Sequence, residues 1–97
     1  MKFELLFHNQ AKLELFESAE WYAQRSLQAY SEFSDYVSSS IEKIKINPHA
    51  FPTVYKNKKK CIIKKFPFSI IFIINGNQIF VISVFHHSRN PNIWKKR

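Results

Sequence analysis

The chain has 97 residues, of which 45% are hydrophobic and 16% aromatic, which excludes intrinsic disorder and fits one domain with an apolar core. The net charge of +8 is uneven, because residues 1–42 carry seven acids and three bases whereas residues 43–97 carry twelve bases and no acid. The single glycine excludes a Gly-rich phosphate loop, and the single cysteine excludes a disulfide framework and a zinc site built on paired cysteines. We therefore expect one domain over residues 1–97, with no cofactor or metal ion and with an anionic partner.

The absence of acids after Glu42 limits the chemistry of the basic half. Two-metal nucleases and glycosidases need paired carboxylates, which that half does not have. Catalysis there would depend on Lys, Arg, His, Ser or Tyr. The sequence has no run of about 20 apolar residues, and its first residues lack the apolar stretch of a signal peptide. We therefore expect a cytoplasmic protein without a membrane partner.

The N-terminal half predicts a strand followed by two helices. Apolar residues alternate over 3–7, as in a strand, and Asn9 is the expected N-cap of the next element. A 3.6-residue apolar stripe over 11–25 predicts a helix, with Glu14, Glu17 and Glu20 largely on its other faces. A second stripe over 27–46 ends at Asn47-Pro48. The two helices are expected to form an antiparallel hairpin.

Past Pro52 the pattern changes to β-branched and aromatic runs. Strands are predicted over 59–65, 68–74 and 79–85, and Asn75-Gly76-Asn77 predicts a hairpin whose residues accept positive φ. The last two strands are apolar on both faces, so the helices must cover one face and the C-terminal tail or a partner chain the other. The expected fold is α+β in the order β-α-α-β-β-β, with a helical hairpin packed on a small, mainly antiparallel sheet.

Several motifs in this order resemble those of one family. The helical Glu20-Trp21-Tyr22, the Asn47-Pro48 that closes the second helix and the run FPFSIIF over 66–72 resemble the RelE/ParE family of bacterial toxins. The resemblance covers essentially the whole chain, and it implies the same α+β fold.

The tail is similar to the ParE branch in particular. Its pattern is His-x-x-Arg-x-Pro-x-x-Trp, running from His86 or His87 through Arg89 and Pro91 to Trp94. The resemblance implies a toxin of a type II toxin–antitoxin module, held inactive by a cognate antitoxin. ParE-like members are understood to inhibit DNA gyrase by binding it, without bond chemistry.

RelE-like members imply an alternative function, because they cut messenger RNA on the ribosome. In that reaction a base takes the proton of the ribose 2′-OH, and cations stabilise the charge that develops on the phosphate. No tyrosine follows Tyr55, so the C-terminal tyrosine that such relatives use is missing. No acid lies in the basic half, so the glutamate base that some of them use is missing too. We therefore favour the gyrase-binding toxin over an mRNA endoribonuclease. A third possibility is an antitoxin-binding module without toxicity.

Each function predicts its own site residues. For the gyrase-binding toxin the predicted target contacts are Arg89, Lys60, Lys64 and Trp94. Arg89 is foremost among them, because its planar guanidinium suits phosphate or carboxylate. In the nuclease the cations would hold phosphate, and these are Lys58, Lys60, Lys64 and Arg89. One imidazole, of His86 or His87, would act as acid or base. Successive strand residues point to opposite faces, so only one of the two histidines can join any one site.

The same residues also have structural interpretations. The histidines can be strand-end residues, one of them capping backbone groups, and Trp94 can close the sheet by packing. The lysines of 56–60 can be a solvated strand edge or a docking surface for an acidic antitoxin or nucleic acid. We expect the antitoxin to lie on the apolar sheet and the helical hairpin, with acidic residues facing 56–65.

Overall fold

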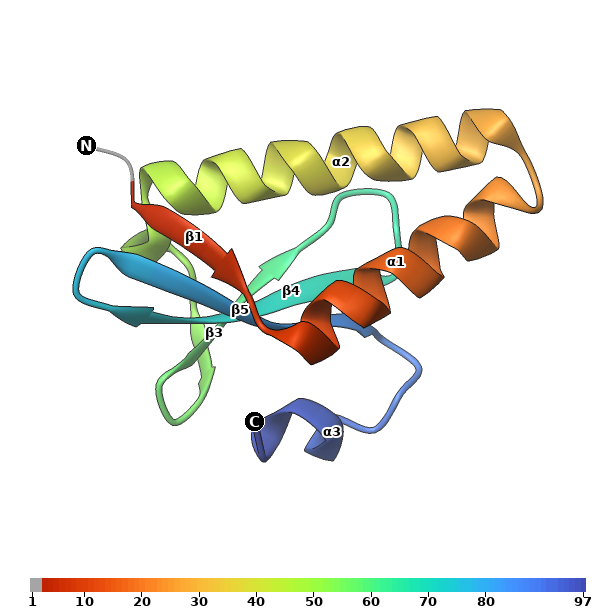
Figure 1. The fold of residues 1–97 in the computed structure, drawn as a ribbon. Coiled ribbons are helices and arrows are strands. Elements are labelled where there is room, and N and C mark those ends of the chain that lie inside the picture. Colours follow the sequence, from red (N-terminus) through yellow and green to blue (C-terminus); the bar gives the residue numbers. More distant parts are fainter. Residues whose placement is uncertain (1–2) are drawn as a thin grey trace.

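The structure is a computed structural model that describes residues 3–97, and it forms three layers (Figure 1). Two long helices, α1 (Asn9–Ala23) and α2 (Leu27–Ile46), lie on one face of a sheet, and the short α3 (Asn92–Lys95) lies on the other. The single-turn helix η1 (Pro48–Ala50) follows α2. The strands are β1 (Glu4–Phe7), β2 (Thr53–Tyr55), β3 (Lys58–Ile62), β4 (Phe68–Asn75) and β5 (Gln78–His86).

The sheet has the strand order β1-β5-β4-β3-β2 and is mainly antiparallel. Only β1 runs parallel to its neighbour, with Glu4 opposite Gln78 of β5. The expected α+β fold and helical hairpin are confirmed. Three short elements, η1, β2 and α3, were not expected, and β3 occupies 58–62 rather than 59–65.

The helix ends follow from local hydrogen bonding. The predicted N-cap at Asn9 is wrong, because His8 is the extended residue before α1 and Asn9 is already helical. Helix α1 also ends at Ala23, two residues before the predicted Arg25. At the start of α2, Ser26 Oγ accepts a hydrogen bond from the Ala29 N–H at 3.2 Å, which satisfies one free donor of the first turn.

Two tight turns join neighbouring strands. In the β4–β5 hairpin Asn75 pairs with Gln78, so Gly76 and Asn77 form the turn, and of these two Gly76 alone has a positive φ, +62°. The β2–β3 turn contains Lys56 at φ +49°, a conformation that costs free energy for a residue with a Cβ atom. The expected hairpin at 75–77 is therefore confirmed, with one left-handed residue in place of two.

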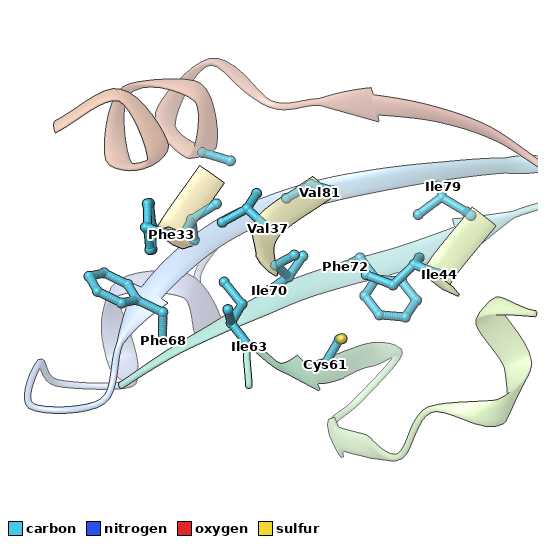
Figure 2. Packing of buried hydrophobic residues seen from close by; sticks show 12 residues of the cluster. Phe33, Val37, Ile44, Cys61, Ile63, Phe68, Ile70, Phe72, Ile79 and Val81 are labelled. Carbon is cyan, nitrogen blue, oxygen red and sulfur yellow. The ribbon is translucent and has the colours of Figure 1, made fainter. Parts of the chain in front are cut away.

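The main core lies between the helical layer and the sheet. Figure 2 shows Phe33, Val37 and Ile44 of α2 facing the inner side chains of the sheet. Tyr22 connects α1 to this core by stacking on Phe33, with ring centroids 4.9 Å apart. Cys61 is also buried here, and burial raises the pKa of its thiol.

No helix of residues 3–97 is long and apolar enough to cross a membrane.

The opposite face of the sheet has a second, smaller core. Trp94 of α3 is 5% exposed and packs edge to face on Phe85, with centroids 5.9 Å apart. Ile71 and Ile82 complete this cluster, and Tyr55 of β2 packs against it. The tail therefore covers the second face of β4 and β5, as their doubly apolar pattern predicted.

Candidate functional site

An ion pair fastens the C-terminal tail to helix α1. Arg97 Nη1 lies 2.9 Å from Glu14 Oε1, and Nη2 lies 3.2 Å from Oε2, so the contact is bidentate. The side chains are only 16% and 10% exposed, respectively. Glu14 therefore does not lie on a solvated face of α1, contrary to the sequence pattern.

The same pair completes the edge of β5 where β1 ends. The last pairing of β1 joins Phe7 to Val81. Beyond that point, Glu14 Oε1 accepts hydrogen bonds from Ser83 Oγ at 2.9 Å and from the Val84 N–H at 3.1 Å. Arg97 Nη1 donates to the Ile82 carbonyl at 2.9 Å. The carboxylate and guanidinium thus satisfy backbone groups that a longer β1 would otherwise have paired.

The loop between β5 and α3 is held at its first residues by the His86 side chain. The Ser88 N–H donates to His86 Nδ1 at 3.0 Å, and Ser88 Oγ lies 2.7 Å from the same nitrogen. The imidazole packs edge to face on Phe68, with ring centroids 4.8 Å apart. One histidine therefore caps a backbone group, as its structural interpretation required.

His87 lies on the other face of the sheet. Its Nε2 is 2.7 Å from Ser69 Oγ, so the two imidazoles diverge as strand alternation predicted. Loss of solvation lowers the pKa of His87, and the positive charges of Lys60 and His86 lower it further. The environment thus favours the neutral imidazole.

Arg89 is exposed at the mouth of a groove of about 450 Å³ between α1 and the end of β5. His86 lines this groove together with Glu17 and the half-exposed Trp21. The guanidinium of Arg25, which follows the end of α1, lies 3.4 Å from the centroid of the Trp21 ring in a cation–π contact. The groove therefore combines charges of both signs with an accessible aromatic surface.

The predicted site residues divide between two sides of the sheet. Arg89 and His86 line the groove beside α1. On β3, Cys61 points into the main core, so its neighbour Lys60 and the alternate residue Lys58 belong to the second face. Lys64 lies in the turn after β3, and Trp94 is a packing residue. Within residues 3–97 the structure brings together no cluster of three His, Cys, Asp or Glu side chains suited to a metal ion.

The sequence interpretation missed the anchoring residues of the tail. Glu14 and Arg97 are 83 positions apart, and nothing local distinguishes Glu14 from the exposed Glu17 and Glu20. The excess of cations over residues 95–97 was a weak indication that one of them pairs with an acid elsewhere in the chain.

Comparisons with known proteins agree with this geometry. A chain of the solved structure entitled "Chromosomal ParDE TA system from P. aeruginosa" superimposes with a TM-score of 0.70, covering 88% of this chain and 96% of that chain at 14% sequence identity. At this identity the likeness concerns the fold alone, which is the α+β fold predicted from the sequence. The family described as "ParE toxin of type II toxin-antitoxin system, parDE" matches residues 5–91, so the chain belongs to the ParE toxin family. No curated protein matches the chain.

Proposed function

We propose that this ParE-family toxin inhibits growth by binding DNA gyrase and that a cognate antitoxin neutralises it. The observation that carries the proposal is the presentation of Arg89. Its loop is fixed by His86 on one side and by the Glu14–Arg97 pair on the other, and the residue is exposed. A cation held on an ordered loop loses little conformational freedom on binding, which favours recognition of an anionic group on a target.

The division of the predicted residues supports binding over RNA cleavage. A nuclease needs its acid–base group and its cations around one phosphate. Here Arg89 and His86 lie beside α1, whereas Lys60 and His87 belong to the second face. Both imidazoles also have serine partners within hydrogen-bonding distance. We therefore place the endoribonuclease second.

The helical hairpin offers the antitoxin an apolar groove of about 410 Å³. Phe16, which is 67% exposed, and Leu15 line this groove together with Lys12. An amphipathic antitoxin segment could bury its apolar side chains here and pair an acidic residue with Lys12. The helical layer and the Trp94 cluster already bury the apolar side chains of β4 and β5, so we place the antitoxin on the hairpin alone. Its acidic residues could also reach Lys65, whose ammonium lies 5.5 Å from the Tyr36 ring of α2.

The test compares two targets with the same purified protein. We expect it to inhibit supercoiling by gyrase and to accumulate cleaved DNA, and we expect added antitoxin to reverse both effects. Messenger RNA incubated with ribosomes and the protein should remain intact. Cut messages with unaffected gyrase would favour the endoribonuclease, and antitoxin binding without either effect would favour a non-toxic binding module.

A further inference from the structure

Three lysine side chains gather around one tyrosine on the second face of the sheet. The Nζ atoms of Lys56, Lys58 and Lys95 lie 5.4, 5.8 and 5.1 Å, respectively, from the centroid of the Tyr55 ring. They come from the β2–β3 turn, from β3 and from α3, so the fold assembles this group from separate segments. We call it the Tyr55 lysine cluster.

The cluster has no compensating negative charge. None of its three ammonium groups forms an ion pair with a carboxylate of residues 3–97. Lys58 is only 8% exposed, an unusual burial for an unpaired lysine. All three ammonium groups lie within about 6 Å of the same ring centroid, so their charges repel one another, with partial screening at physiological salt. Attraction to the ring offsets part of this repulsion, and an anionic ligand would offset more.

The positive surface continues along the same face. Lys60 is close enough to His87 to lower the pKa of that imidazole, and Ser69 Oγ lies beside the ring. Past Glu42 the sequence provides no acid that could interrupt this surface. Its extent and uniform sign fit a polyanion better than a single small anion.

We propose that the Tyr55 lysine cluster binds the phosphate backbone of duplex DNA without reading its sequence. The Tyr55 ring already faces three ammonium groups and packs on the second core, so it offers no free platform for the bases of a single strand. Duplex DNA needs no such platform, because its phosphates line the outside of the helix. The proposed antitoxin groove lies in the helical layer, on the other side of the sheet (Figure 1). The proposal does not depend on which enzyme the toxin inhibits.

The test measures binding of the purified chain to a fluorescent DNA duplex of about 20 base pairs between about 50 and 200 mM salt. We expect the slope of log K against log salt to lose about 0.9 for each lysine contact removed. The variant Lys56→Gln/Lys95→Gln should therefore bind on the order of tenfold more weakly at intermediate salt, with a shallower slope. Gln keeps most of the aliphatic stem, and circular dichroism should show an unchanged fold.

A control with equal net charge is Lys43→Gln/Lys45→Gln, whose lysines are both on α2. It should bind duplex DNA within about twofold of the unchanged protein, since the electrostatic effect of distant charges is screened. Equal weakening in both variants, or no weakening in either, would overturn the proposal. Tighter binding to single-stranded RNA or to polyglutamate than to the duplex would also overturn it, and would indicate an RNA or an acidic protein as the occupant. Gyrase inhibition is measured separately, so a negative result here leaves that proposal standing.

Discussion

Glu14 and Arg97 meet as a bidentate pair across 83 positions of sequence, and their contact closes the edge of β5 that β1 leaves open. Each group also satisfies the backbone of the strand between them: the carboxylate accepts from Val84, and the guanidinium donates to Ile82. Helix α1, strand β5 and the tail are therefore linked through one small polar network.

We expect Arg97→Ala to lower the free energy of unfolding by about 3 kcal/mol, because it leaves the buried Glu14 carboxylate without its cation. Urea denaturation measures this change. The matched control is Lys45→Gln, which removes the more exposed Lys45–Glu42 pair at 3.5 Å and should cost less than about 1 kcal/mol. Equal effects of the two substitutions would mean that the tail contact contributes no more than a surface ion pair.

Arg89→Ala should weaken gyrase inhibition by on the order of 10- to 100-fold, since it removes a charge-assisted contact of about 1.5–3 kcal/mol. Antitoxin binding should not change, because Arg89 lies outside the hairpin groove. Inhibition assays and titration calorimetry measure the two effects. Lys43→Ala, which removes an exposed cation from α2, serves as the control.

The double variant His86→Ala/His87→Ala separates binding from catalysis. A gyrase-binding toxin should keep most of its inhibition, because binding requires no proton transfer; loss of the His86 contacts loosens the Arg89 loop and should weaken inhibition only a fewfold. An endoribonuclease should lose about 10²–10⁴ in cleavage rate. A folded variant that still engages ribosomes but no longer cuts messages would overturn the gyrase proposal.

Phe16→Asp should reduce antitoxin affinity by more than about tenfold while leaving stability nearly unchanged, because the side chain is 67% exposed before binding. Ile46→Asp is a matched control, since Ile46 is 60% exposed but lies outside the groove. Co-purification and calorimetry report the affinity, and thermal unfolding reports the stability. Retained affinity in Phe16→Asp would place the antitoxin elsewhere.

The two hairpin turns predict substitutions of opposite sign. Gly76→Ala should destabilise the protein by about 1–2 kcal/mol through its φ of +62° alone, since the added Cβ meets nothing within 4 Å beyond its own residue and the two chain neighbours. Lys56→Gly should stabilise the protein by about 0.5 kcal/mol. Glycine removes the backbone strain of a side chain at φ +49°, and this gain exceeds the entropy that glycine loses on folding. In the same turn Asn57→Gly has no such strain to relieve and should destabilise. Denaturant midpoints measure all three changes.

Stability should also depend on His87. The pKa of His87 in the folded protein is below the usual 6.5, so the folded state favours the neutral ring. The protein is therefore at its full stability, as far as this group is concerned, above pH 6.5. This contribution to stability is lost as the pH falls from 6.5 through the lowered pKa. We therefore expect a smaller loss of stability between about pH 7.5 and 5.5 in His87→Gln than in the unchanged protein. Identical pH profiles would show that the lowered pKa has no measurable effect on folding.

Local sequence patterns were sufficient to predict the long elements. The helices over 11–25 and 27–46 and the strands over 68–74 and 79–85 each have a periodicity that extends over several residues. The β2 and α3 elements escaped prediction because they have three and four residues, too few for a period to show. Their positions depend on packing against β3 and the second core.

The candidate site was predictable only in part. The divergence of His86 and His87 follows from strand alternation, which is a local property. The pairing of Glu14 with Arg97 and the gathering of lysines around Tyr55 both depend on tertiary contacts between distant segments, so neither left a local pattern. The burial of Glu14 also depends on a tertiary contact, because its carboxylate packs against the edge of β5. The sequence of α1, which has several glutamates, does not indicate which of them is buried.

The parallel pairing of β1 with β5 has a consequence for synthesis on the ribosome. Glu4 is made long before Gln78, its partner across the sheet, and the intervening strands β3 and β4 have no direct pairing with β1. The helical hairpin can form early from contacts close in sequence, but the sheet closes only after β5 has emerged. The nascent chain therefore acquires its β1 edge, and with it the site beside α1, only once β5 has left the ribosome, rather than gradually.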